Sequence, residues 1–140
     1  MVEIIDARGL VIGRLSTHVA KRLLENKKLE IAVVNAEKAI VSGNRKMVIN
    51  SYRAKRDLNH PRKGPNFPKL PDRILKRTIR GMLPYQQEKG REALKRVKVY
   101  IGVPKDLEGK KVRTVESAKN KDLEQFVELL EISRTLGAKI

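Results

Sequence analysis

Residues 29–35 form an apolar run, broken only by Glu30 and closed by Asn35. A strand with one face in water alternates apolar and polar side chains, and this run does not alternate, so we expect both of its faces to be buried. Before it, Leu15, Val19 and Leu23 recur at every fourth residue, which indicates a helix. Strands that alternate with helices favour an α/β fold with a mainly parallel sheet.

The remaining elements follow from similar patterns and from turn residues. Further strands are expected at residues 3–6, 39–41 and 97–102, and further helices from Asn44 through Tyr52, at 71–82 and at 90–96. At 140 residues the chain has the size of one domain, 1–140. In its acidic C-terminal extension, about 103–140, the pattern fits either a short edge strand followed by a helix or one long helix.

Positive charge is concentrated in one part of the chain. Residues 45–98 hold 17 Lys and Arg against four acids, which gives +13 of the total net charge of +16. Such a lopsided distribution predicts a polyanionic partner, most commonly nucleic acid. With only five Phe and Tyr and no Trp, phosphate contact and shape recognition are better supported than stacking of bases on rings.

Two segments carry most of this charge. Residues 53–70 lack periodicity and contain three prolines, so they predict a long basic loop that becomes ordered against phosphate. Pro71 can open the following helix. Spacing at about 100° per residue places four cations in one arc of that helix, opposite Ile74, Leu75, Ile79 and Met82; the cations are Arg73, Lys76, Arg77 and Arg80.

Catalysis has little support in the sequence. The loop from Gly9 to Ser16 lies between a strand and a helix but lacks the spacing and the Lys of a phosphate-binding P-loop, so a tight turn is favoured, although Arg14 could touch a phosphate from the helix start. His18, His60 and Asp6 have no partner that suggests proton transfer. The chain has no Cys, which excludes disulfides and thiolate metal sites. We expect no catalytic residue, metal or cofactor.

The longest apolar run, residues 31–34, is far too short to span a membrane. The N-terminus lacks the features of a signal peptide. A soluble cytoplasmic protein is therefore expected.

Several motifs together resemble one family, the L-thirteen ribosomal proteins of the large subunit. They are Ile-Asp-Ala at 5–7, Gly-Arg-Leu-Ser at 13–16, Val-Asn-Ala-Glu-Lys at 34–38, Ser-Gly-Asn at 42–44, Arg-Gly-Met-Leu-Pro at 80–84 and Val-Lys-Val-Tyr-Ile-Gly at 97–102. Their order and spacing match along almost the whole chain, and Arg-Gly-Met-Leu-Pro is the most specific. The immediate start at the first strand and the long stretch after Gly102 resemble the archaeal and eukaryotic branch.

The resemblance implies a three-layer α/β/α fold around a four-stranded, mainly parallel sheet. It also implies a structural constituent of the large ribosomal subunit that binds ribosomal RNA, contacts neighbouring ribosomal proteins and acts early in assembly, with no catalytic activity and no small-molecule substrate. The expected RNA-binding residues are Arg14, Arg45, Lys46, Arg53, Lys55, Arg56, His60, Arg62, Lys63, Lys69, Arg73, Lys76, Arg77 and Arg80. The alternatives are a nucleotide-dependent enzyme that uses the Gly9–Ser16 loop and a DNA-compacting protein.

Overall fold

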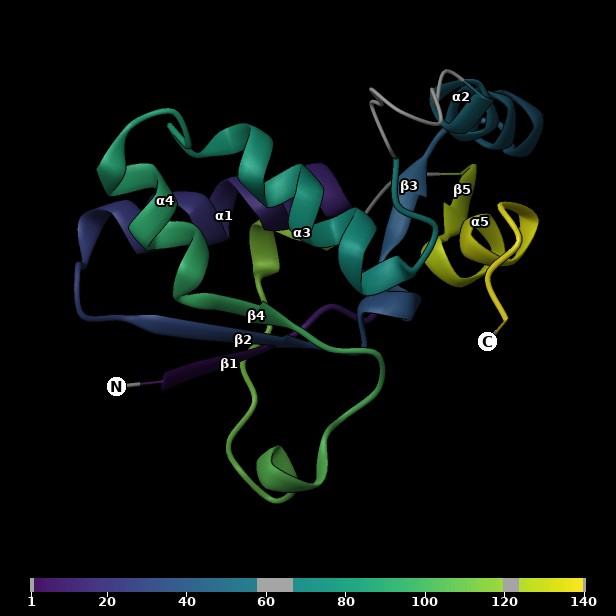
Figure 1. Ribbon diagram of the computed structural model, residues 1–140. Coiled ribbons are helices and arrows are strands. Elements are labelled where there is room, and N and C mark those ends of the chain that lie inside the picture. The colour runs from purple at the N-terminus through teal and green to yellow at the C-terminus, as the bar shows by residue number, and fades with distance from the viewer. Residues whose placement is uncertain (1, 58–66, 120–123, 140) are drawn as a thin grey trace.

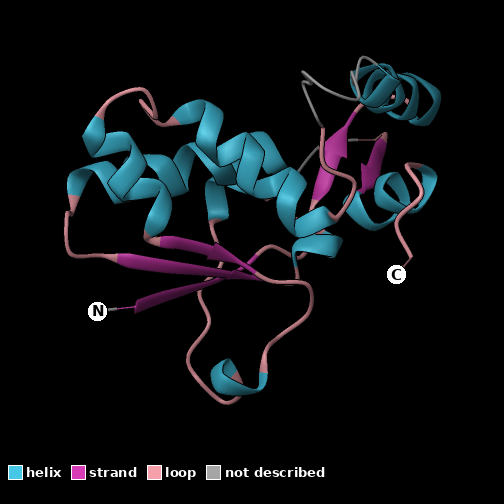
Figure 2. Ribbon diagram, in the orientation of Figure 1, coloured by secondary structure: helices cyan, strands magenta, loops and turns pink. Residues whose placement is uncertain are grey.

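A computed structural model describes residues 2–57, 67–119 and 124–139 of the chain (Figures 1 and 2). In chain order its elements are β1 (Val2–Asp6), α1 (Ile12–Glu25), β2 (Glu30–Val34), the 3-10 helix η1 (Ala36–Lys38), β3 (Ile40–Ser42), α2 (Arg45–Asp57), α3 (Pro71–Met82), α4 (Glu88–Lys95), β4 (Val97–Val99), the 3-10 helices η2 (Lys105–Leu107) and η3 (Glu116–Ala118), β5 (Phe126–Glu128) and α5 (Leu129–Thr135).

The central sheet is parallel, in the order β1-β2-β4, with Ile5 beside Val33 and Ile31 beside Val97. Residues 31–34 of the middle strand β2 are all buried, so the expectation of a strand covered on both faces is confirmed. Successive side chains point to opposite faces of a strand. Two apolar clusters therefore form, one on each side of β2.

Helices α1, α3 and α4 cover one face of this sheet (Figure 1). Their apolar stripes pack on Ile5, Ile31 and Val33 in the main core. On the other face Ile4, Ala32 and Val34 are covered by Tyr100 and Leu107, from the segment that carries η2. The predicted α/β class with a mainly parallel sheet is confirmed, and the layer on this second face consists of loop and the short η2.

The expectation of four strands in one sheet is wrong. The predicted strand at 39–41 exists as β3, but it pairs antiparallel with β5, and an isolated bridge between Val11 and Ile40 links it to the segment before α1. Asn35 takes a left-handed conformation (φ 56°) at the end of β2 and starts η1, which turns the chain away from the parallel sheet. For the C-terminal extension, the alternative of an edge strand followed by a helix is confirmed by β5 and α5.

The helix starts agree with their sequence signals, whereas one helix end does not. The Asn44 side chain accepts a hydrogen bond from the Lys46 N–H (2.9 Å), and Pro71 is the first residue of α3, as expected. However, α2 continues to Asp57, so the basic loop expected from residue 53 starts later. The segment 53–57 lacks apolar periodicity because most of its side chains are exposed, which concealed the helix. None of the helices among the described residues could cross a membrane.

Candidate nucleic-acid interface

Helix α3 has one buried face and one cationic face. Ile74, Leu75 and Ile79 are at most 1% exposed in the core. The predicted arc is brought together as expected: its four cations line a groove of about 340 Å³ whose apolar walls are Pro68 and Leu94. These cations are Arg73, Lys76, Arg77 and Arg80. No carboxylate from the described part of the chain lines the groove, so it presents a positive, partly desolvated surface that fits phosphate.

The prediction that Met82 belongs to the core face of α3 is wrong. Met82 is 41% exposed, while Leu83, one residue beyond the helix, is 3% exposed and takes the core position. The Thr17 hydroxyl donates to the Met82 sulfur at 3.3 Å, so the start of α1 lies against the end of α3. Arg14 precedes Thr17 by three residues and shares its helix face. The Arg14 side chain is exposed, and its predicted contact with RNA stays a prediction.

Phe67 links the cations of α2 to those of α3. Its ring lies 5.1 Å from the Arg77 guanidinium and 5.6 Å from the Lys55 ammonium, and its carbonyl accepts a hydrogen bond from the Arg56 guanidinium. Cations over aromatic faces are held by the ring quadrupole. Two separate basic helices are thus joined into one surface by an aromatic residue.

Tyr52 anchors this link in the core. Its ring lies 5.8 Å from that of Phe67 and is only 7% exposed. Burial raises the pKa of the Tyr52 phenol above its ordinary value of 10.0, because the phenolate would lose its hydration. The neutral phenol is therefore a structural group, and the Lys55 ammonium, 4.7 Å from the ring centre, is held above it.

Six other predicted RNA-binding residues fall into two groups. Lys46, Arg53 and Lys69 are exposed, and they form no ion pair within the described residues. Their charges remain available to a partner. His60, Arg62 and Lys63 lie outside the described residues, so their predicted role stays a prediction.

Arg45 is paired with a residue of the acidic extension. Glu131 of α5 forms an ion pair with Arg45 at the start of α2. The extension therefore borders the basic surface, since α5 packs against α2. The side chain of Arg45 is 71% exposed, so the pair leaves the guanidinium accessible while neutralising part of its charge.

Some arginines that contribute to the sequence charge are structural. Arg96 donates hydrogen bonds to the carbonyl oxygens of Leu23 and Leu29 at 3.0 Å and of Asn26 at 2.6 Å, and so caps the end of α1. Charge counting cannot separate such a residue from a ligand-binding one, because the distinction depends on tertiary contacts.

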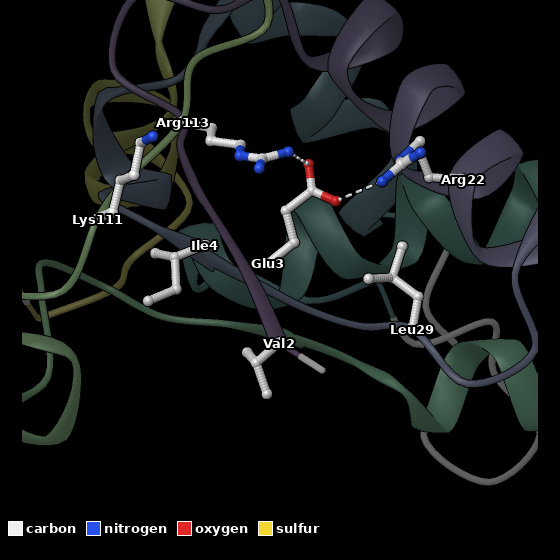
Figure 3. Close-up of a pocket in the computed structure, with 7 residues that line it drawn as sticks. All are labelled: Val2, Glu3, Ile4, Arg22, Leu29, Lys111 and Arg113. Atoms are coloured by element: carbon white, nitrogen blue, oxygen red, sulfur yellow. Dashed lines mark hydrogen bonds and ion pairs between the residues drawn. The ribbon is translucent and has the colours of Figure 1, made fainter.

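A second structural cluster lies at the edge of β1. In Figure 3 the Glu3 carboxylate lies between the guanidinium groups of Arg22 and Arg113, at 3.0 and 3.9 Å. Glu3 is 10% exposed, so these cations balance a nearly buried charge. They line a pocket of about 180 Å³, and Glu3 compensates only part of their charge.

The Gly9–Ser16 segment has the structure of a turn. Gly9 has φ 71°, a conformation that suits glycine, and its N–H donates to the Lys38 carbonyl at 3.1 Å. Ser16 is 0% exposed, so its hydroxyl cannot reach a nucleotide. Asp6 accepts hydrogen bonds from the Arg8 N–H and the Asn35 side chain, at 2.9 and 3.1 Å, so its carboxylate stabilises the turn after β1.

Sequence reasoning missed the apolar and aromatic partners of the cations. Tyr85 is 42% exposed, and the Arg80 guanidinium lies 5.2 Å from its ring centre. The sequence signal that could have identified Tyr85 as a partner of Arg80 was its position directly after Pro84, close to the end of the cationic helix. Leu94 and Pro68 gave none, because single apolar residues outside a periodic pattern do not predict a groove.

Comparisons with known proteins all identify the same family. A model of the family described as Ribosomal protein L13 matches residues 1–106. Large ribosomal subunit protein uL13 of Methanosarcina barkeri is 49% identical over 140 residues, covering 99% of both chains. The proteins of the same name from Methanosphaera stadtmanae and Thermoplasma acidophilum are 47% and 43% identical, and the alignments cover 99% and 97% of this chain and 99% and 98% of theirs. The resemblance to the archaeal branch is confirmed by these relatives.

Proposed function

Because this chain belongs to the ribosomal protein L13 family, we propose that it is a structural constituent of the large ribosomal subunit in the cytoplasm, where it binds large-subunit ribosomal RNA. Its relatives are ribosomal proteins, which agrees with the expectation that the chain is not an enzyme. Neighbouring ribosomal proteins are its further partners.

One observation carries the proposed RNA binding: the α3 groove gathers four cations with no described carboxylate among its lining residues. Like charges at this spacing repel one another, and phosphate groups remove that repulsion. Arg offers bidentate hydrogen bonds to phosphate, while Lys acts as a point charge. The exposed cations of α2 extend this surface through the Phe67 link.

The mechanism is electrostatic anchoring. Phosphates from RNA segments that are distant in sequence are neutralised on one rigid surface, so those segments can approach each other during early assembly. If about eight phosphates are neutralised, log affinity falls with log salt at a slope of about −7.

The test replaces the four α3 cations with Gln together and measures RNA affinity from low to high salt. We expect the slope to become less steep by about 4, with an unchanged circular dichroism spectrum because none of the four residues belongs to the buried core. The matched control replaces four exposed lysines from β4 and the segment around η2. These are Lys98, Lys105, Lys110 and Lys111.

The control has the same change in net charge, so a general field effect would alter both slopes equally. Equal slopes for the two variants would refute anchoring at α3. Competition between ribosomal RNA and duplex DNA at physiological salt tests the alternative of DNA compaction, which an equal preference would favour.

A further inference from the structure

A second pocket, distant in sequence from the α3 groove, combines an exposed aromatic ring with two cations. It has a volume of about 530 Å³, within the usual range of about 300–1,000 Å³ for small-ligand sites. Its lining includes Arg8, Lys38, Ile40, Phe126, Glu128 and Leu130. We call it the β3–β5 pocket.

The backbone fixes the residues of this pocket. The hydrogen bond from the Gly9 N–H to the Lys38 carbonyl (3.1 Å) holds the turn that carries Arg8 against the end of η1. In the β3–β5 ladder Val127 points into the core and is 2% exposed, so its neighbours Phe126 and Glu128 face outward. Phe126 is 46% exposed, and Ile40, 2% exposed, forms an apolar floor.

The described residues do not neutralise the two cations. The side chains of Arg8 and Lys38 form no hydrogen bond or ion pair with any described residue. Glu128 is the one carboxylate that lines the pocket in the part of the chain that the structure describes. The pocket therefore offers a flat apolar ring, two phosphate-binding cations and one acceptor.

We propose that the β3–β5 pocket binds a single unstacked nucleotide of an RNA loop or bulge. The base stacks on Phe126, the phosphate binds Arg8 and Lys38, and Glu128 accepts a hydrogen bond from an amino group of the base. A nucleotide supplies a flat base and an anion in one unit, which matches this combination. The proposal rests on the proposed RNA binding and adds a site that reads an unpaired base.

The first experiment measures the affinity of the full chain for large-subunit ribosomal RNA purified from Methanosarcina barkeri. Phe126→Leu keeps an apolar side chain on β5 but removes the ring, and we expect affinity to fall about tenfold, within the range for one lost base–aromatic stack. Phe126→Tyr keeps the ring and should stay within about twofold. The control Val112→Ala changes an exposed apolar residue elsewhere.

The salt dependence separates stacking from charge. Phe126→Leu should leave the slope unchanged, whereas Arg8→Gln with Lys38→Gln should make it less steep by about 2. Wild-type affinity in Phe126→Leu, or an equal loss in Phe126→Leu and Phe126→Tyr, would overturn the stacking assignment.

The second experiment places the photocrosslinking amino acid p-benzoylphenylalanine at position 126 in assembled large subunits. A crosslink to a ribosomal RNA nucleotide supports the proposal. A crosslink to a protein, or none, overturns it in favour of a protein-docking surface or an unoccupied one. If the α3 variant shows the expected less steep salt slope while these tests fail, only the nucleotide pocket is refuted and the proposed function stands.

Discussion

Gly90 packs so closely against Pro84 that a Cβ atom at position 90 would lie 2.0 Å from the Pro84 carbonyl oxygen. This contact docks α4 against the turn that follows α3. Arg91 reinforces it by donating hydrogen bonds to the carbonyl oxygens of Tyr85 and Gln86, both at 3.0 Å. Because Leu94 lies one turn further along α4, the contact also positions a wall of the cationic groove.

Gly90→Ala should therefore destabilise the protein. The methyl group meets backbone rather than a flexible side chain, so we expect the free energy of unfolding in urea to fall by about 2–3 kcal/mol, near the upper part of the range for overpacking. Gly81→Ala is the matched control, since Gly81 lies within α3 with open space around it. That variant should gain about 0.5–1 kcal/mol. Equal stability of the two variants would contradict the packing argument.

Arg96→Gln should lower stability without altering RNA binding. The variant loses the guanidinium that caps the end of α1, and we expect the free energy of unfolding to fall by about 2 kcal/mol. Arg73→Gln should behave in the opposite way, with unchanged stability and a salt slope of RNA binding less steep by about 1. Urea titrations and salt-dependent affinities of both variants make the comparison. A reduced slope in Arg96→Gln would mean that this residue also contacts phosphate.

Tyr52 should make stability depend on alkaline pH. Its pKa is raised in the fold above the ordinary 10.0, so its full contribution is present below about pH 10 and is lost as the pH rises through the raised pKa. Tyr52→Phe removes this dependence. The difference in free energy of unfolding between wild type and Tyr52→Phe should be constant below pH 10, and above it wild type should lose stability relative to the variant. A constant difference up to pH 11 would show that the phenol ionises freely.

Much of the fold could be predicted because the signals are local. The uninterrupted apolar run of β2, the Asn44 cap and the Pro71 start each depend on a few adjacent residues. The pairing of β3 with β5 could not be predicted, because it joins residues that lie more than 80 positions apart. The continuation of α2 to Asp57 was hidden for a different reason: an exposed helix end carries no apolar period.

The positive charge of the candidate site could be predicted from the sequence, but the contacts that hold its side chains in place could not. Helical spacing was sufficient to bring the cations of α3 into one arc, since 3.6 residues per turn fixes that geometry. Helical spacing could not show that Phe67 contacts cations of both α2 and α3, or that Arg96 caps the end of α1. Both depend on tertiary contacts, which for Arg96 join residues 67 to 73 positions apart, and identical side chains serve either purpose.

The pair formed by Arg45 and Glu131 gives a last prediction about the limits of the RNA-binding surface. Both side chains are more than a third exposed, so the ion pair contributes little to stability, and Glu131→Gln should change the free energy of unfolding by less than about 1 kcal/mol. The substitution releases the charge of Arg45 at the start of α2. We expect RNA affinity to rise about threefold at low salt and the salt slope to steepen by about 1.

The double variant Arg45→Gln with Glu131→Gln provides the control. Removing both charged groups should cancel the gain, because the effect of Glu131→Gln acts through the released guanidinium. If Glu131→Gln leaves both affinity and slope unchanged, Arg45 does not reach the RNA and only ties α2 to α5. The edge of the RNA-binding surface on α2 would then lie beyond Arg45, toward the exposed cations near Phe67.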